Sequence, residues 1–276
     1  MILSHLHGAR TRFHMIQLNV MSLNLRKETK EDGNNNWPDR IGLVVRLINE
    51  VTPHILGTQE GRRPQVYGLL DALEGYGIAD LHRKWDPQRS YPCIFYYRDF
   101  LQILESGDRW LSETPEVHAS KSWGSAYPRL ATWARCRSRE SRTEFFFTCT
   151  HMDHVSAEAR SGQARALNKL LDEKKGDALP LIVVGDFNDV PGSVPYQTLT
   201  SSLEDVWRNT HSHDKGEGTW HGFSGKAQKG RLDWILASPD VKAIDATILR
   251  TSYQGRYPSD HFPVKATLGV GFTGPV

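Results

Sequence analysis

Several short runs of polar residues carry side chains suited to phosphate or metal chemistry, and each lies within or at the end of an apolar stretch. They are Ser22-Leu23-Asn24, Gln59-Glu60, Thr150-His151-Met152-Asp153-His154, Gly185-Asp186-Phe187-Asn188, Arg231-Leu232-Asp233 and Ser259-Asp260-His261. Rigid scaffolds present catalytic groups at the ends of strands, so the recurrence of these runs predicts one shared site.

The side-chain types in these runs fit the hydrolysis of a phosphoester. The carboxylates are hard oxygen ligands that suit Mg²⁺ or Mn²⁺ better than zinc, and they are Glu60, Asp186, Asp233 and Asp260. The amides of Asn24 and Asn188 can offer a carbonyl oxygen or donate to a phosphate. His151 and His261 can donate to a phosphoryl oxygen or transfer a proton. A metal, a positioned base and such donors together stabilise the transition state of phosphoester hydrolysis.

The apolar stretches that must position these runs read mostly as strands. We expect strands at 15–25, 54–59, 93–97, 101–106, 131–136, 144–150, 179–185, 231–236 and 264–268. We expect helices from Trp37 to before Pro53, at 67–73 and at 157–173, and a loop at 27–36. This order of elements predicts an α/β fold, a four-layer α/β sandwich of two packed mixed β-sheets flanked by helices. Residues 1–14 read as an N-terminal extension, and residues 15–276 as one domain.

Composition excludes some classes of protein. The 276 residues are 38% hydrophobic and 24% charged, which is typical of a globular chain. The net charge of +2 argues mildly against a large polyanionic partner, since strong nucleic-acid binders carry a clear basic excess. One local run remains open to two interpretations, a basic patch or a hairpin edge protected by charge. It contains Arg135, Arg137, Arg139 and Arg142.

The cysteines and the lack of a long apolar run indicate the cellular compartment of the protein. Cys93, Cys136 and Cys149 are odd in number and widely spaced, which disfavours a disulfide framework and a thiolate zinc site. We find no apolar run of transmembrane length and no secretory signal. These features predict a cytoplasmic protein without stable membrane association.

In order and approximate spacing, the polar runs resemble those of the endonuclease/exonuclease/phosphatase superfamily, from about Met15 to Leu268. Further segments are similar to a largely uncharacterised, bacterial-type branch of it. These are 37–40, 110–115, 128–129, 132–134, 218–223 and 257–264. The resemblance implies the DNase I-like fold and a Mg²⁺- or Mn²⁺-dependent phosphoesterase, and it leaves the substrate open.

The resemblance also implies a role for each motif residue. Asn24, Glu60 and Asp260 lie on the metal side. The catalytic residues implied are His151, Asp186, Asn188, Asp233 and His261. Asp233 pairs with His261, and His151 donates to a non-bridging oxygen. Whether Asp186 or His261 acts as the general base stays open, as does the number of metals.

Residues beside these motifs are weaker candidates. Arg129 is a candidate phosphate ligand, and a surface salt bridge is nearly as good an interpretation. Others that we expect to shape the pocket are Arg62, Gln65, His154 and His221. The aromatic residues Trp123, Trp220 and Phe223 either stack on a substrate or belong to the core.

Four functions compete on this sequence. The first is hydrolysis of a small phosphomonoester or phosphodiester, which the near-neutral charge favours. The second is a DNA or RNA nuclease of the same fold, which predicts a basic stripe. The third is a sphingomyelinase-like lipid phosphodiesterase, which predicts an exposed apolar hairpin. The fourth is a non-catalytic binding module, which the complete catalytic set disfavours. The oligomeric state stays open.

Overall fold

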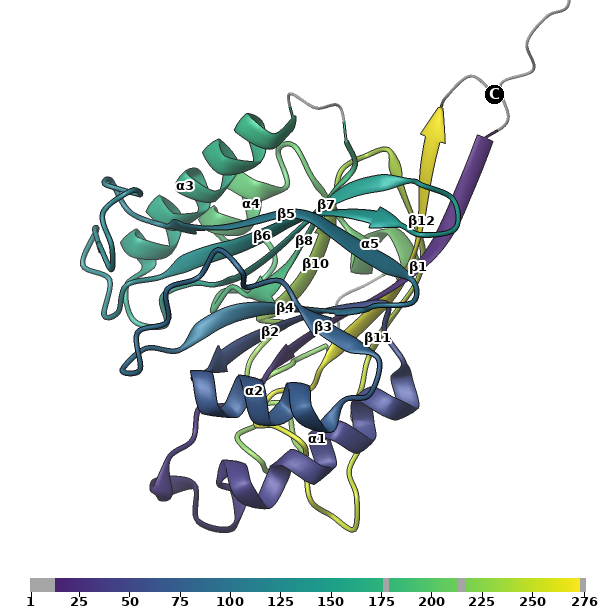
Figure 1. Cartoon of the computed structure of the whole chain (residues 1–276). Coiled ribbons are helices and arrows are strands. Elements are labelled where there is room, and N and C mark those ends of the chain that lie inside the picture. Colours follow the sequence, from purple (N-terminus) through teal and green to yellow (C-terminus); the bar gives the residue numbers. More distant parts are fainter. Residues whose placement is uncertain (1–12, 176–178, 213–216, 274–276) are drawn as a thin grey trace, which may run out of the picture.

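Two six-stranded β-sheets pack face to face in the computed structural model, which describes residues 13–175, 179–212 and 217–273 (Figure 1). The first sheet has the order β11 (Val241–Ile248), β12 (Val264–Thr273), β1 (Phe13–Asn24), β2 (Ile55–Gly61), β4 (Tyr91–Tyr97) and β3 (Tyr76–Ile78). The second has the order β5 (Leu101–Trp110), β6 (Leu130–Ser138), β7 (Glu144–His151), β8 (Leu181–Asp186), β10 (Asp233–Ala237) and β9 (Glu204–Asp205).

Helices cover the outer face of each sheet, which completes four layers. Helices α1 (Trp37–Val51) and α2 (Arg63–Ala72) pack on the first sheet. Helices α3 (Ala157–Lys175) and α4 (Val194–Leu199) pack on the second. The short α5 (Val206–Thr210) contacts β10 and β11, and a 3₁₀ turn, η1 (Lys30–Asn35), precedes α1. The predicted α/β sandwich of two mixed sheets is confirmed.

Local sequence signals set the ends of α1. The Asn36 side chain accepts a hydrogen bond from the backbone N–H of Trp37, and proline lies in the first turn, where its missing N–H costs nothing. At the other end Thr52 adopts a left-handed conformation, with φ of 46°, directly before Pro53. The apolar side of the helix, including Val44 and Ile48, is buried against the first sheet.

The two sheets approach closely beneath the polar ends of their central strands. Gly57 on β2 faces Val184 on β8, and a Cβ added at Gly57 would lie 2.3 Å from Val184 Cγ2. A side chain at this position would therefore force the sheets apart. The close approach brings strand ends of both sheets to one place.

Strand register aligns the predicted site residues across the sheets. Parallel pairing of β1 with β2 places Asn24 beside Gln59. Parallel pairing of β7 with β8 places His151 beside Asp186, and antiparallel pairing of β8 with β10 places Asp233 on the other side of Asp186. The motif residues therefore gather at one edge of the sandwich.

Some elements differ from the expected ones. Strand β5 runs on to Trp110, beyond the expected end at residue 106, and the loop at 27–36 contains η1. Elements β3, β9, β11, α4 and α5 were not expected. Strand β1 begins at Phe13, so its first residues fall within the expected extension, of which residues 1–12 lie outside the described ranges.

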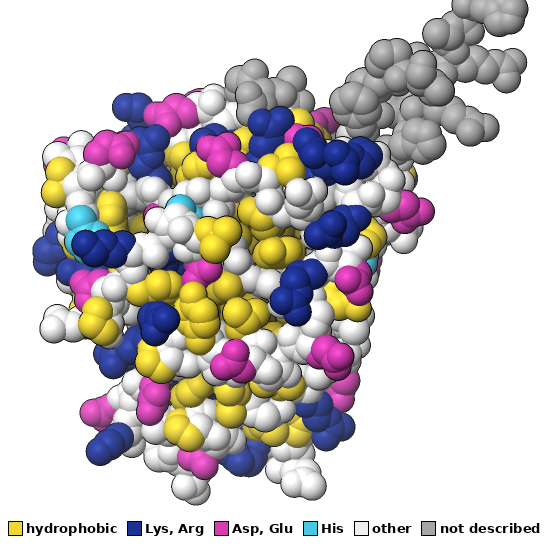
Figure 2. All heavy atoms as spheres, in the orientation of Figure 1, with side chains coloured by type: hydrophobic (Ala, Val, Ile, Leu, Met, Phe, Trp, Pro, Cys, Tyr) yellow, Lys and Arg dark blue, Asp and Glu magenta, His cyan; other side chains and the backbone are white. Residues whose placement is uncertain are grey.

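The structure excludes one of the two interpretations of the arginine run, of which Arg135 and Arg137 lie on β6. Strand β6 lies between β5 and β7, so the interpretation as a charge-protected hairpin edge is wrong. The Nε groups of Arg135 and Arg137 donate to the Glu144 carboxylate at 2.8 and 2.7 Å. On the face in Figure 2, Lys and Arg side chains are mixed with Asp and Glu and form no continuous stripe. Within the described ranges, no helix is both long and apolar enough to cross a membrane.

Candidate active site

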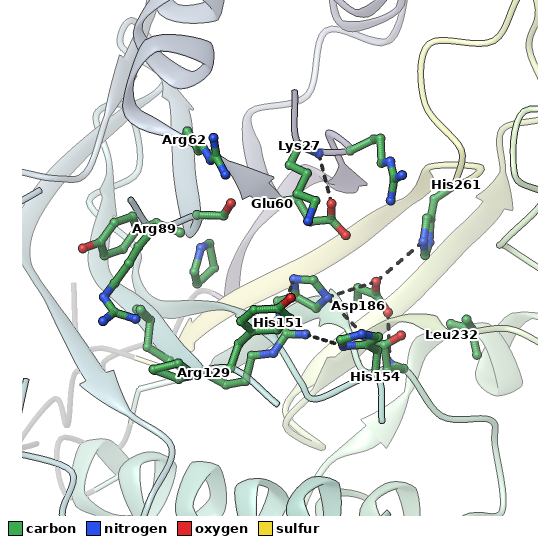
Figure 3. A pocket seen from close by; sticks show the side chains of 18 of the residues that line it. Lys27, Glu60, Arg62, Arg89, Arg129, His151, His154, Asp186, Leu232 and His261 are labelled. Carbon is green, nitrogen blue, oxygen red and sulfur yellow. Dashed lines mark hydrogen bonds and ion pairs between the residues drawn. The ribbon is translucent and has the colours of Figure 1, made fainter. Parts of the chain in front are cut away.

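A pocket of about 400 Å³ opens at the edge where the motif-bearing strands end (Figure 3). Its lining includes most of the predicted site residues, namely Glu60, Arg62, Arg129, His151, His154, Asp186, Asn188, Asp260 and His261. Asn24 and Asp233 are buried just behind it. They hydrogen-bond to residues that face the pocket, so the structure brings the whole predicted core of the site together.

His261 and Asp233 form a buried pair. The Nδ1 atom of His261 lies 2.8 Å from Asp233 Oδ2, and the two side chains are 6% and 1% exposed. Burial disfavours the imidazolium, but the charges of Asp233 and Asp186 outweigh it and hold the pKa of His261 well above its ordinary value. The pairing predicted from the sequence is therefore present in the geometry, and it directs His261 Nε2 toward Asp186.

Asp186 is the hub of the site. Its Oδ2 accepts a hydrogen bond from Asn24 Nδ2 at 3.0 Å and lies 3.7 Å from His261 Nε2 and 3.5 Å from His151 Nε2. Its Oδ1 accepts the backbone N–H of Asn188 at 2.9 Å. Burial raises the pKa of Asp186 to about 7; the His261 charge opposes the rise and the Asp233 charge adds to it. A carboxyl group with this pKa is suited to exchanging a proton near neutral pH.

Glu60 reaches the pocket through a distorted stretch of β2. The pairing of β2 with β4 shifts register between Thr58 and Gly61, and Glu60 has a positive φ of 66°. Such conformations are uncommon outside glycine and cluster at functional sites. The Glu60 carboxylate accepts hydrogen bonds from Asn24 Nδ2 at 3.2 Å and from the Lys27 N–H at 3.0 Å. Burial acts to raise the pKa of Glu60, but the Lys27 N–H and the His261 charge outweigh it and lower that pKa.

Asp260 is, with Glu60, the second carboxylate of the pocket that is suited to bind a metal. It lines the same pocket as Glu60, is 6% exposed, and lies 3.9 Å from the Arg26 guanidinium. Burial raises the pKa of Asp260; the His261 charge opposes the rise and the Glu60 charge adds to it. The repulsion between buried Asp260 and half-buried Glu60 is what a bound divalent cation would relieve, and their oxygen donors suit Mg²⁺ or Mn²⁺.

A different set of ligand atoms also has the spacing of a metal site. Atoms of Asp186, Asp233 and His261 lie within 4.8 Å of one another. In this set, however, Asp233 and His261 are already hydrogen-bonded to each other, and a metal would have to replace that bond. The oxygen donors of Glu60 and Asp260 need no such rearrangement, so they fit a hard cation better.

Arg129 contacts two histidines. Its NH1 lies 3.0 Å from His151 Nδ1 and its NH2 lies 3.2 Å from His154 Nδ1. Burial lowers the pKa of Arg129, and burial together with the Arg129 charge lowers the pKa of both imidazoles. The alternative of a surface salt bridge is wrong, because both terminal nitrogens are directed at these imidazoles.

Basic side chains around the pocket went largely unnoticed in the sequence. Those that line it are Arg26, Lys27, Arg62, Arg89, Arg129 and Lys229. In Figure 3, Arg62, Arg89 and Arg129 lie on one side of the pocket, and Asp186 and His261 lie on the other. Arg89 comes from the loop before β4 and Lys229 from the loop before β10, and neither sits in a motif. Their gathering depends on the tertiary fold, so the sequence carried no signal for it.

Several weaker candidates have structural roles instead. Buried His221 stacks on Phe262 with ring centroids 3.9 Å apart and is not among the residues that line the pocket. Gln65 is 1% exposed and accepts the Glu28 N–H at 3.0 Å, so it supports the loop beneath the pocket. Trp123 packs against Gly162 and Phe223 lies over Arg40, whereas Trp220 does line the pocket.

Arg40 connects the segment after β1 to the segment that carries Asp260. It is fully buried, and its NH1 donates to the carbonyl oxygens of Leu25 at 3.1 Å and Pro258 at 2.6 Å. Its NH2 donates to the Arg26 carbonyl at 3.2 Å and its Nε to that of Asn35. The Trp37-Pro38-Asp39-Arg40 motif thus places a guanidinium behind the metal side of the pocket.

Comparisons with known proteins agree with this geometry. The sequence profile of the Endonuclease/Exonuclease/phosphatase family matches residues 17–261. An endonuclease/exonuclease/phosphatase family protein from Bacteroides thetaiotaomicron is 31% identical, with a TM-score of 0.84 over 93% of this chain and 99% of that one. A mannosyl-6-phosphatase from the same species is also 31% identical, with a TM-score of 0.84 over 91% and 99%.

A curated yeast protein matches over a shorter stretch. It is the inositol phosphosphingolipids phospholipase C of Saccharomyces cerevisiae, 29% identical over 142 residues. The match covers 40% of this chain and 29% of the length of the yeast protein.

Proposed function

Because this chain belongs to the endonuclease/exonuclease/phosphatase family, whose members hydrolyse phosphoester bonds, we propose that it is a divalent-metal-dependent phosphoesterase of small phosphorylated molecules. One observation carries the proposal. The pocket of about 400 Å³ is lined both by carboxylates and imidazoles and by arginines and lysines, which suits a compact anionic substrate. Similarity to a mannosyl-6-phosphatase over nearly the whole chain makes a phosphorylated sugar the first substrate class to test.

In this proposal Glu60 and Asp260 would hold the metal, and Asn24 would orient Glu60. The carboxylates of Glu60 and Asp260 face one pocket, and the Asn24 amide donates to Glu60 at 3.2 Å. When bound, Mg²⁺ or Mn²⁺ would neutralise charge on the phosphoryl oxygens and on the leaving oxygen.

In this proposal Asp186 accepts a proton during the reaction and His261 donates a hydrogen bond. Asp186 would orient the attacking water and receive its proton, which its position between His151 and His261 and its pKa of about 7 support. Asp233 keeps His261 protonated, so that His261 would offer an N–H and a positive charge to the phosphoryl oxygens. The amide of Asn188 and the imidazole of His151 complete the donors around the phosphate.

A panel of substrates tests this proposal. Phosphate release would be followed with mannose 6-phosphate, a generic phosphomonoester, a generic phosphodiester, single-stranded DNA, RNA and a phosphosphingolipid, each with Mg²⁺, with Mn²⁺ and with EDTA. His261→Ala serves as the inactive control. We expect EDTA-sensitive turnover of the small monoesters. Preferential cleavage of nucleic acid or of the lipid would overturn the small-molecule assignment, and turnover by His261→Ala at the wild-type rate would overturn the site.

A further inference from the structure

Arg129 makes an unusual bridge between two imidazoles of the pocket. One terminal nitrogen lies 3.0 Å from His151 Nδ1 and the other lies 3.2 Å from His154 Nδ1. The ring of His154 also stacks on Tyr127 at a centroid distance of 5.8 Å, and the Arg129 guanidinium lies over that same Tyr127 ring. The two histidines are therefore held by one cation, on the side of each ring that carries Nδ1.

The chemistry of the guanidinium decides which ring nitrogen carries the proton. Arginine stays charged in proteins and has only N–H donors, so both Nδ1 atoms must act as acceptors. A neutral imidazole has one acceptor nitrogen and one N–H. The hydrogen of each ring is consequently on Nε2.

His151 Nε2 has one acceptor and one amide nitrogen near it. Asp186 Oδ2, an acceptor, lies 3.5 Å from it. Asn188 Nδ2 lies 3.0 Å from the same atom, but this amide also donates to the Met152 carbonyl at 3.0 Å. The Met152 carbonyl fixes the amide nitrogen on this side and takes one of its two N–H groups, so the amide does not depend on a bond to His151, whereas the guanidinium has no acceptor form. Arg129 therefore decides the tautomer.

His261 provides the opposite case within the same pocket. Its Nδ1 faces the Asp233 carboxylate at 2.8 Å, which is an acceptor, so its Nδ1 carries a proton. Thus the pocket holds histidines whose Nδ1 atoms are fixed in opposite roles. His151 and His154 face a donor, and His261 faces an acceptor.

We propose that Arg129 is a positioning residue that fixes His151 and His154 in the neutral Nε2–H tautomer. This inference rests on the proposed function for its consequence, which is that His151 presents an N–H to a phosphoryl oxygen. The carboxylate behind His261 and the guanidinium behind His151 thus prepare two histidines for different tasks. Arg129 itself acts through the imidazoles.

Long-range ¹H–¹⁵N correlation spectra of the imidazoles read the tautomers directly in the intact protein. His151→Gln and His154→Gln would assign the two rings. In the wild type we expect one tautomer, Nε2–H, for both. In Arg129→Met both rings should shift toward a mixture of tautomers, while the His261 signals stay in place. Arg62→Met removes another pocket arginine, one without a hydrogen bond to a histidine among the described residues, and it should leave both tautomers unchanged.

Kinetics provide a second readout. With a substrate found active, Arg129→Met should lower kcat about 10- to 100-fold, the range typical of a group that orients a functional imidazole from behind. Arg129→Lys should not restore both tautomers, because an ammonium lacks the planar fork that reaches two rings. A wild-type proton on Nδ1 of either ring, or unchanged tautomers in Arg129→Met, would overturn the proposal. Since the spectra need no substrate, failure of the proposed function would be distinguishable from failure of this inference.

Discussion

Asp233 has one contact that governs the chemistry of its neighbour. Its Oδ2 lies 2.8 Å from His261 Nδ1, and its Oδ1 has no hydrogen-bond partner among the described residues. Asp233 is 1% exposed, so the imidazolium beside it is the main group that stabilises its negative charge. The pair therefore also stabilises the fold, because an imidazolium whose pKa is raised in the folded state adds stability while it stays charged.

Replacing Asp233 with asparagine should separate these roles. In Asp233→Asn we expect kcat to fall about 10³-fold or more, because an amide behind a catalytic imidazole favours the wrong tautomer. Circular dichroism should show that the variant folds, and thermal unfolding should report a loss of stability, because one partner of a buried ion pair is removed. Asp240→Asn, on the exposed turn before β11, is the matched control and should keep wild-type turnover. A variant Asp233→Asn with near-normal kcat would remove His261 from the mechanism.

The residue types of the site were predictable, but their detailed geometry was not. Glu60, Asp186 and His261 stand in runs whose chemistry the sequence displays. The positive φ of Glu60 depends on a register shift against β4, a partner strand distant in sequence. Similarly, the contact of Arg129 with His151 arises only when β6 and β7 pair side by side.

At the scale of elements, Arg40 holds two loops to each other behind the site. Its guanidinium donates to carbonyl oxygens of Leu25 and Arg26 after β1 and of Pro258 before Asp260. Arg40→Met would remove the buried donor to the carbonyls of Leu25 and Pro258, which costs about 1–3 kcal/mol for each group. We expect lower stability, and a rise of about 10- to 100-fold in the Mg²⁺ concentration for half-maximal activity. Chemical unfolding and metal titration of the rate measure the two effects.

Arg256 offers the matched control for Arg40. It also donates to backbone carbonyls, those of Asn34 and Asp39, but it does so at the exposed surface. Arg256→Met should therefore leave the Mg²⁺ dependence unchanged. If Arg40→Met did not fold, Arg40→Lys would give the same comparison. An unaltered Mg²⁺ dependence in a folded Arg40 variant would limit Arg40 to a structural role.

A second set of contacts between elements, made by Arg83, holds the loop that leads into β4 at the pocket. Arg83 in this loop donates to Asp108 on β5 at 2.7 and 2.8 Å and to Thr132 on β6 at 2.6 Å. Burial acts to raise the pKa of Asp108, but the hydrogen bond and charge of Arg83 outweigh it and hold that pKa below its ordinary value. Arg89, farther along this loop, and Tyr91, the first residue of β4, line the pocket.

The pH dependence of stability follows from this depressed pKa. A carboxyl group whose folded pKa is lowered adds stability that is present above its unfolded pKa of about 4 and is lost as pH falls further. At pH 7, Asp108→Asn should cost about 3 kcal/mol, as expected for breaking a buried ion pair. The difference between wild type and variant, measured by urea unfolding, should shrink as pH falls below about 4. A difference that stays constant down to pH 3 would contradict this account.

The long apolar strands were predictable because their composition and length leave few alternatives. β8 is buried along its whole length, and β7 nearly so. Strand β11 was missed because a register shift between Ala243 and Asp245 interrupts its alternation, so that Ile244 is exposed beside Asp245. Strand β9, of two residues, forms only through its pairing with β10.

At the scale of the whole molecule, charge is nearly balanced but unevenly placed. The net charge is +2, yet six cationic side chains line one pocket. On the face in Figure 2 the cations alternate with acidic groups, whereas nucleic-acid binders usually carry a basic stripe. The attraction for an anion is therefore focused at the pocket.

The dependence of KM on ionic strength tests whether the attraction for an anion is concentrated at the pocket. Raising ionic strength from about 0.1 M to about 1 M shortens the screening length from about 10 Å to about 3 Å. We expect KM for a phosphorylated substrate to rise over that range, with kcat changing less. The double variant Arg62→Gln/Arg89→Gln should start from a higher KM and show a weaker salt dependence. Equal salt dependence in both proteins would place the attraction elsewhere.

The most direct test of the central claim is the initial rate of phosphate release as Mg²⁺ is varied, for wild type and for Glu60→Gln. The substitution removes the charge of one proposed metal ligand and keeps its shape. We predict saturable activation that EDTA abolishes and added Mg²⁺ restores, with Glu60→Gln needing about 10- to 100-fold more Mg²⁺ and reaching a lower rate. Turnover that survives EDTA, or a Glu60→Gln curve that overlays the wild type, would contradict a metal-dependent phosphoesterase at this site.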